Sequence, residues 1–216
     1  MLFHAQALLV DIDGTLVDST AAVVASWTTW AARHRLDVEE ILRVCHGRRS
    51  QDTIAMFLPA DQVASATRDL EELELAALDG VTALPGAEVL LRELPSDRWA
   101  GVTSGSQALM RARLAAAALP VPAVLIAAEN VSEGKPDPEG YLTAAAALRY
   151  DIMDCVVIED SPAGIAAGRA AGAQTVAVAT SHDADELTGA DTVVPNLTYF
   201  AVELRTDHVV LSANSA

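Results

Sequence analysis

Short apolar stretches that alternate with helix-like stretches organise the chain from residue 87 onward. Alternation of this kind is typical of a parallel sheet that has helices on both faces. Helices fit between the apolar stretches at about 87–94, 106–118, 138–149 and 162–171. The strands themselves are expected at 99–103, 123–126, 155–158, 175–179 and 192–194.

A further buried strand is predicted near the start of the chain, at 7–11, because this segment is short, apolar and ends in an acid. Between it and residue 87, helix-like stretches follow one another at about 20–35, 38–45, 51–58 and 61–78. We therefore predict an α/β fold, a Rossmann-like parallel-sheet core with a helical cap inserted after the first strand. Residues 1–18 and 85–216 are assigned to the core, residues 19–84 to the cap, and a hairpin is expected at about 199–211.

The charge balance restricts the partners of this chain. Its formal net charge is −16, and such a surface repels nucleic-acid phosphates and anionic membranes, so neither is an expected partner. The two cysteines, Cys45 and Cys155, have no metal-site spacing, and the N-terminal segment lacks the pattern of a signal peptide. We expect a cytoplasmic monomer that must supply local positive charge wherever it binds a phosphorylated small molecule.

Polar residues gather where the predicted strands end, which is where open parallel sheets bind ligands. The strand at 7–11 leads into Asp11 and Asp13, and Gly14 permits a tight turn before Thr15. The strand at 99–103 leads into Thr-Ser-Gly-Ser, which offers hydroxyls and free backbone N–H groups at a helix start. Such groups are suited to binding phosphate oxygens.

The other strand ends add a lysine and a second acid pair. Lys135 is the only lysine of the chain, and Glu159 and Asp160 follow the strand at 155–158. Carboxylates clustered in one cleft repel each other unless a cation joins them, and oxygen ligands favour Mg²⁺ over zinc. Each motif alone is ordinary turn or helix-start chemistry, but their joint occurrence at four strand ends predicts a phosphate and metal site.

Four motifs, in this order along the chain, resemble those of the haloacid dehalogenase superfamily, in the branch of phosphatases with a helical C1 cap. They are Asp11-Ile-Asp-Gly-Thr-Leu-Val-Asp-Ser, Val102-Thr-Ser, Gly134-Lys-Pro and Val157-Ile-Glu-Asp-Ser. Three segments together most resemble sugar-phosphate, 2-deoxyglucose-6-phosphate and glycerol-phosphate phosphatases. They are the cap segment His46-Gly-Arg-Arg-Ser, Trp99-Ala-Gly-Val-Thr-Ser-Gly-Ser and Gly134-Lys-Pro-Asp-Pro-Glu-Gly-Tyr141. The resemblance therefore implies a Mg²⁺-dependent phosphatase acting on a small phosphate monoester, such as a sugar or polyol phosphate.

The resemblance also implies roles for individual residues. Asp11 would attack phosphorus and carry an aspartyl-phosphate, while Asp13 would protonate the leaving alcohol and later activate water. Mg²⁺ would be held by the Asp11 carboxylate, the Asp13 backbone carbonyl and Asp160, with Glu159 acting through water. Lys135 would bind phosphate oxygens.

The remaining candidates for binding the substrate belong to two groups. The first surrounds the phosphate, and the second lies in a cap loop that is expected to face the substrate when the cap closes over the site. The phosphate group comprises Gly14, Thr15, Thr103, Ser104 and Gly105, and the cap-loop group comprises His46, Gly47, Arg48 and Arg49.

Two alternatives remain open, a phosphosugar mutase of the same superfamily and a non-catalytic protein that binds a phosphorylated ligand. Family mutases place a histidine at the cap hinge, where this chain has Thr20-Ala-Ala-Val, and an idle protein would be expected to lose a motif residue. A phosphonate hydrolase needs a cap lysine, which is absent, and a dehalogenase lacks acids equivalent to Asp13 and Asp160. A receiver-like signalling domain has no helical insert and carries an adjacent acid pair.

Overall fold

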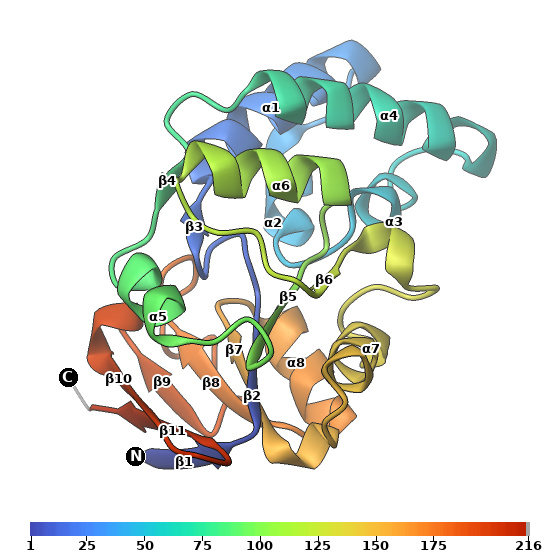
Figure 1. Ribbon diagram of the computed structural model, residues 1–216. Helices are drawn as coiled ribbons and strands as arrows, with labels where there is room; N and C mark the ends of the chain where they lie inside the picture. Colours follow the sequence, from blue (N-terminus) through green and yellow to red (C-terminus); the bar gives the residue numbers. More distant parts are fainter. Residues whose placement is uncertain (215–216) are drawn as a thin grey trace.

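Six parallel strands form the central sheet of the computed structural model, which describes residues 1–214. The sheet has the order β6-β5-β2-β7-β8-β9, so β2 lies between β5 and β7 (Figure 1). The predicted parallel α/β sheet is confirmed. Its strands are β2 (Ala7–Val10), β5 (Trp99–Val102), β6 (Leu125–Ile126), β7 (Cys155–Glu159), β8 (Gln174–Val178) and β9 (Thr192–Val194).

Both faces of this sheet are covered by helices, which explains why its strands are apolar without alternation. Because successive side chains of a strand point to opposite faces, Leu8 and Val10 pack in one apolar cluster and Ala7 and Leu9 in another. The first cluster includes residues of α5 (Ala87–Glu93) and α6 (Gln107–Ala116). The second includes residues of α7 (Glu139–Leu148) and α8 (Pro162–Ala171).

A smaller antiparallel sheet joins the two ends of the chain. It has the order β1-β11-β10, with β1 (Leu2–Ala5), β10 (Phe200–Leu204) and β11 (Val209–Ala213). The predicted C-terminal hairpin is therefore present as β10 and β11. The strand β1 was not predicted from the sequence, because its partner strand β11 lies at the opposite end of the chain. The strand predicted at 7–11 is therefore β2, the second strand of the chain and not the first.

Four helices stand above the sheet and form the cap (Figure 1). They pack around an apolar cluster that includes Trp27, Trp30 and Leu70, and the indole N–H of Trp30 donates a 2.9 Å hydrogen bond to the Ala66 carbonyl oxygen. A cluster of this kind gives the cap its own core. The helices are α1 (Thr20–His34), α2 (Val38–Cys45), α3 (Ser50–Ile54) and α4 (Ala60–Ala76).

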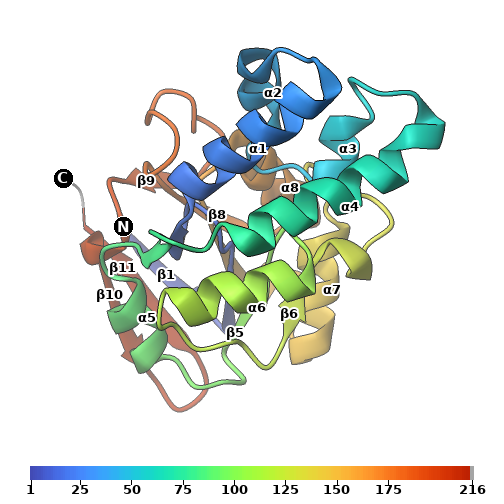
Figure 2. The same ribbon diagram turned by 90° about the horizontal axis from the view of Figure 1, so that it is seen from above.

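The cap is joined to the sheet by two short strands, β3 (Val17–Asp18) and β4 (Thr82–Ala83), which pair antiparallel. Figure 2 shows α4 of the cap lying beside α6 of the core. The predicted residue boundaries between cap and core stay a prediction. Three 3₁₀ helices complete the described fold, η1 (Ala128–Asn130), η2 (Ile152–Asp154) and η3 (Leu197–Tyr199).

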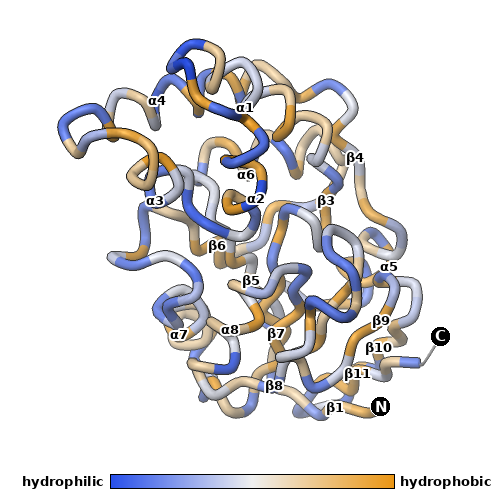
Figure 3. The backbone as a smooth tube through the Cα atoms, turned by 180° about the vertical axis from the view of Figure 1, so that it is seen from behind, coloured by the Kyte–Doolittle hydropathy of each residue, from blue (hydrophilic) through white to orange (hydrophobic). Residues whose placement is uncertain are grey.

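Hydropathy differs between the sheet and the region below the cap. In Figure 3 the strand β7 is largely hydrophobic, whereas hydrophilic segments lie between the sheet and the cap. Within residues 1–214, no helix combines the length and the apolar character that crossing a bilayer requires. The monomeric state and cytoplasmic location stay predictions.

Candidate active site

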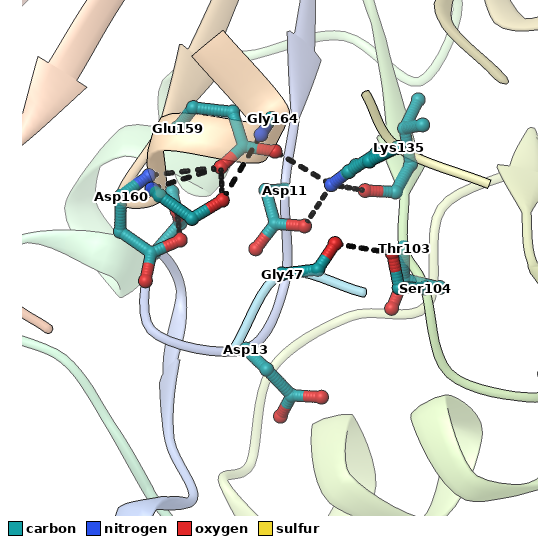
Figure 4. Close-up of polar contacts among 12 residues, drawn as sticks. Asp11, Asp13, Gly47, Thr103, Ser104, Lys135, Glu159, Asp160 and Gly164 are labelled. Atoms are coloured by element: carbon teal, nitrogen blue, oxygen red, sulfur yellow. Dashed lines mark hydrogen bonds and ion pairs between the residues drawn. The ribbon is translucent and has the colours of Figure 1, made fainter. Parts of the chain in front are cut away.

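A buried ion-pair cluster lies at the carboxyl end of the central strand β2. Asp11 directly follows β2, Glu159 ends the neighbouring strand β7, and Lys135 comes from the loop after β6. The Lys135 Nζ atom contacts the Asp11 carboxylate and lies 2.6 Å from Glu159 Oε1 and 3.2 Å from the Val102 carbonyl oxygen (Figure 4). The only lysine of the chain is therefore the cation shared by two of its buried acids.

The proton affinities of this cluster reflect its burial. Burial raises the pKa of Asp11 well above its usual range, and the negative charges of Glu159 and Asp160 add to this, while Lys135 opposes it. Burial and the charge of Glu159 raise the pKa of Asp160 to about 7. For Lys135, burial would lower the pKa, but Asp11 and Glu159 raise it above the ordinary value, so this side chain stays charged.

The acids of the cluster fit a divalent cation. Oxygen atoms of Asp11, Glu159 and Asp160 lie within 4.8 Å of one another, and Lys135 forms ion pairs with only two of these three carboxylates, those of Asp11 and Glu159. Gly14 has a φ of +81°, and a Cβ atom there would overlap the Asp160 carboxylate, so the main chain of this loop passes directly beside the cluster. Oxygen donors with excess negative charge are what Mg²⁺ binds in proteins.

Hydrogen bonds fix the two acids at the end of β7. Glu159 Oε2 accepts from the backbone N–H groups of Asp160 and Ser161, at 3.0 and 3.2 Å, and Glu159 Oε1 accepts from the Tyr141 hydroxyl at 2.7 Å. Asp160 accepts from Thr15 Oγ1 at 3.2 Å and from the hydroxyl of Ser181. Sequence reasoning assigned no role to either hydroxyl: Tyr141 ends the stretch that follows Lys135, and Ser181 lies outside the four motifs.

The predicted phosphate loop after β5 lies at the same pocket as Asp11. Thr103, Ser104 and Gly105 line this pocket, and the Gly105 N–H donates to Thr103 Oγ1 at 3.1 Å. The Ser104 hydroxyl donates to the carbonyl oxygen of Gly47 in the cap loop, at 2.8 Å (Figure 4). Two other predicted phosphate ligands do not line the pocket: Thr15 contacts Asp160, and Lys135 lies behind Asp11.

The side chain of Asp13 points away from this cluster (Figure 4) and belongs to a second group of charged residues. Its Oδ1 accepts from the Ser19 hydroxyl at 2.7 Å, and its Oδ2 lies 2.6 Å from Arg113 Nη1. Arg113 belongs to α6, is 3% exposed, and also contacts Glu74 of the cap helix α4 through Nη2 at 3.0 Å. Sequence reasoning missed both Arg113 and Glu74, which read as exposed charges on helices.

The cap loop brings some of its predicted residues to the pocket and not others. His46, Gly47 and Arg48 line it. Arg49 does not, because its buried guanidinium contacts the Asp52 carboxylate at 2.7 Å and the carbonyl oxygens of residues 131 and 132 at 3.2 and 3.0 Å. Arg49 thus attaches the cap loop to the core instead of facing the substrate side.

A family profile described as a haloacid dehalogenase-like hydrolase matches residues 5–172, which include all four motifs. The chain belongs to the haloacid dehalogenase-like hydrolases. The resemblance read from the motifs is therefore confirmed, and so is the prediction of an enzyme, a phosphoric monoester hydrolase.

Curated relatives of this haloacid dehalogenase-like hydrolase are named phosphatases. The chain is 43% identical over 203 residues to hexitol phosphatase A of Escherichia coli, covering 91% of this chain and 94% of that protein. It is 36% identical over 238 residues to 2-deoxyglucose-6-phosphate phosphatase 1 of Saccharomyces cerevisiae, covering 99% and 97%. Glycerol-1-phosphate phosphohydrolase 2 of the same yeast is 36% identical over 204 residues, covering 88% and 82%.

Solved structures of similar proteins have the same fold. A hydrolase from Pseudomonas syringae superposes with a TM-score of 0.80 at 27% identity, covering 88% of this chain and 93% of that chain. CbbY from Rhodobacter sphaeroides, solved in complex with phosphate, superposes with a TM-score of 0.77 at 26% identity, covering 89% and 95%.

Proposed function

We propose that this haloacid dehalogenase-like hydrolase is a Mg²⁺-dependent phosphatase that hydrolyses a sugar or polyol phosphate through an aspartyl-phosphate on Asp11. The observation that carries the proposal is the position of Asp11. Asp11 directly follows the central strand β2, contacts the buried Lys135, and lines a pocket together with Asp13 and the loop at 103–105. This is a nucleophile, a cation and a set of phosphate-binding donors in one place.

The first step is attack of an Asp11 carboxylate oxygen on phosphorus, with departure of the ester oxygen. Lys135 holds the Asp11 side chain in place and offsets the charge of the incoming phosphate. The hydroxyl and backbone N–H groups of Thr103, Ser104 and Gly105 bind phosphate oxygens at the start of α6. Asp13 gives its proton to the departing alkoxide and then accepts one from the water that hydrolyses the aspartyl-phosphate.

The residues that would hold Mg²⁺ are Asp11 and Asp160 through carboxylate oxygens and Asp13 through its backbone carbonyl, with Glu159 acting through water. When bound, the ion offsets the repulsion between the Asp11 carboxylate and the phosphate. The cap loop around Gly47 closes the pocket through its contact with Ser104 and keeps bulk water away from the acyl phosphate.

The substrate class follows from the relatives and from the lining of the pocket. Three of the relatives are named for phosphate esters of hexitols, 2-deoxyglucose and glycerol, all of which have neutral polyhydroxyl leaving groups. Polar groups of the cap that can bind hydroxyls line the pocket, among them Ser50, Arg48 and Glu74. We infer that a polyol or sugar phosphate is the substrate.

The mutase alternative is less well supported. Beta-phosphoglucomutase of Bacillus subtilis is 28% identical over 214 residues, so the family does not exclude this activity. At the cap hinge, however, the pocket is lined by Ser19, Thr20 and Val23, none of which can shuttle a proton as a histidine does.

The test is phosphate release from a panel of phosphate esters, with Mg²⁺ and with EDTA. We expect metal-dependent release that is greatest for hexitol, hexose and glycerol phosphates. Asp11→Asn should lower turnover at least about a thousandfold while the circular dichroism spectrum and melting temperature show a folded protein. Turnover retained in this variant, or no release from any ester by the folded wild-type protein, would contradict the proposal.

A further inference from the structure

We propose that Glu74, held in place by Arg113, selects the leaving group, accepting neutral polyhydroxyl groups and rejecting those that carry a second anionic group. This inference rests on the proposed phosphatase function and specifies its substrates further. It starts from a group that neither the four motifs nor the metal site uses.

Glu74 lies on the cap wall of the pocket that also contains Asp11. It is near the end of α4 and is only 6% exposed, yet it lines the pocket together with Asp13 and Arg113. Among the cap residues that line the pocket within residues 1–214, Glu74 is the only acid. A substrate whose phosphate contacts Asp11 therefore extends its leaving group toward a buried carboxylate.

The Arg113 guanidinium does not cancel this negative charge, because it is shared between two carboxylates. Arg113 Nη1 lies 2.6 Å from Asp13 Oδ2, and Arg113 Nη2 lies 3.0 Å from Glu74 Oε1. In the substrate-free protein, before Asp13 takes up the proton that it later gives to the leaving group, one positive charge thus faces two negative ones. This part of the pocket therefore has an excess negative charge when the substrate enters. A carboxylate or second phosphate placed there meets electrostatic repulsion that burial strengthens.

The same arrangement favours hydroxyl groups. Glu74 Oε1 is occupied by Arg113, whereas no hydrogen bond to Glu74 Oε2 is present in the part of the chain that the structure describes. That oxygen is an acceptor of defined orientation, because the ion pair with Arg113 fixes the side chain. Burial raises the pKa of Glu74 above its ordinary value, and the charge of Arg113 opposes this rise. A hydroxyl group donates a stronger hydrogen bond to a carboxylate than to a neutral acceptor.

The cation of the cap loop does not reverse this selection. Arg48 also lines the pocket, but its side chain is exposed to solvent. Charges exposed to solvent are screened by water and salt, whereas buried charges are screened much less. The buried Glu74 therefore has the greater effect on a charge carried by the leaving group.

The experiment uses two esters that differ at the end far from the phosphate. Sorbitol 6-phosphate ends in CH₂OH, and 6-phosphogluconate ends in a carboxylate. We expect wild-type kcat/KM to favour sorbitol 6-phosphate at least about tenfold, and Glu74→Gln to reduce this preference about tenfold, mainly through a lower KM for 6-phosphogluconate. If Glu74 only held the cap closed, Glu74→Gln would change kcat/KM for both esters by the same factor, and that outcome would contradict the inference.

Glu71→Gln is the matched control. Glu71 lies one turn earlier on α4 and accepts a hydrogen bond from the Ser106 hydroxyl of the core, but it does not line the pocket that contains Asp11. The substitution removes the same charge from the same helix, and the preference should stay at the wild-type value. An active wild-type enzyme whose preference is unchanged by Glu74→Gln contradicts this inference alone. Wild-type protein that hydrolyses neither these esters nor any other contradicts the phosphatase function itself.

Discussion

At the scale of single residues, the position of Glu159 depends on the absence of a side chain at Gly164. The first turn of α8 passes so close to Glu159 that a Cβ atom on Gly164 would overlap the carboxylate (Figure 4). Glu159 in turn contacts Lys135 and accepts a hydrogen bond from the Tyr141 hydroxyl. The ion-pair cluster can therefore form only if residue 164 has no side chain, although Gly164 is not itself one of the charged residues.

We predict that Gly164→Ala lowers kcat/KM by at least about a hundredfold, because the displaced Glu159 no longer holds Lys135 beside Asp11. The measurement is steady-state kinetics together with thermal unfolding. Gly80→Ala is the control, since Gly80 has a φ of +82° but no neighbouring atom within 4 Å of an added Cβ. It should cost about 1 kcal/mol of stability and leave kcat/KM near wild type. Equal kinetic effects of the two substitutions would contradict the prediction.

The raised pKa of Asp160 predicts how pH affects metal binding. This pKa is about 7 in the folded, metal-free protein because of burial and of Glu159, against an ordinary value of 3.8. Because the folded protein binds the Asp160 proton more tightly than the unfolded chain does, the protonated carboxyl stabilises the folded state. This contribution to the free energy of unfolding is fully present below about pH 4 and is lost as the pH rises through about 7. Mg²⁺ binds the ionised form, so its affinity should rise about tenfold from pH 6 to pH 8.

Calorimetric titration with Mg²⁺ at the two pH values measures this effect directly. In the metal-free protein, the melting temperature should fall across the same interval, and saturating Mg²⁺ should restore it. A dissociation constant that is the same at pH 6 and pH 8 would show that Asp160 is already ionised without metal.

At the scale of elements, buried arginine side chains attach the cap to the core in two regions, in addition to the connection through β3 and β4. One is the loop before α3, where Arg49 contacts Asp52 and the carbonyl oxygens that follow η1. The other is the pairing of α4 with α6, where Glu74 contacts Arg113. Both attachments combine a cap residue with a core segment that is distant in sequence, so they hold the cap over the pocket.

We predict that Arg49→Met lowers the free energy of unfolding by about 2–4 kcal/mol, because it removes a buried guanidinium from its partners. The neighbouring Arg48→Met is the matched control, and because Arg48 is exposed its effect on stability should stay within about 0.5 kcal/mol. Urea denaturation followed by fluorescence of the cap tryptophans measures both. Similar midpoints for the two variants would mean that the Arg49 contacts contribute no net stability.

At the scale of the whole molecule, the net charge of −16 acts on every phosphorylated ligand before it reaches the pocket. Positive charge near the pocket comes from Lys135 beside Asp11 and from Arg48 and Arg113, which line it. The approach of a phosphate dianion is therefore opposed by the overall field and favoured only at short range.

We predict that kcat/KM for a phosphate ester rises about two- to fivefold when KCl raises the ionic strength from about 0.01 to 0.15 M at constant free Mg²⁺, because screening weakens the long-range repulsion. The change should appear in kcat/KM and not in kcat, since it concerns the encounter. A fall in kcat/KM with added salt would mean that the local cations dominate the field felt by the substrate.

The sequence by itself determined the sheet, the helical cap and the convergence of the four motifs. Parallel strands must place their carboxyl ends at one edge, so Asp11, Thr103, Lys135 and Glu159 could be expected together from their order alone. Each motif can also be recognised locally, because a few adjacent residues form both the end of a strand and the turn that follows it.

Only the tertiary structure decided which isolated side chains complete the site. Arg113 lies 100 residues from Asp13 and 39 from Glu74, and in sequence each reads as an ordinary charge on a helix. The packing of α4 against α6 buries Arg113 and Glu74 together and turns two surface charges into one wall of the pocket. The separate contact of the cap loop with the segment after η1 attaches Arg49 to the core and leaves Arg48 at the pocket. The sequence of two adjacent arginines does not show this difference, because it depends on the backbone path of the cap loop.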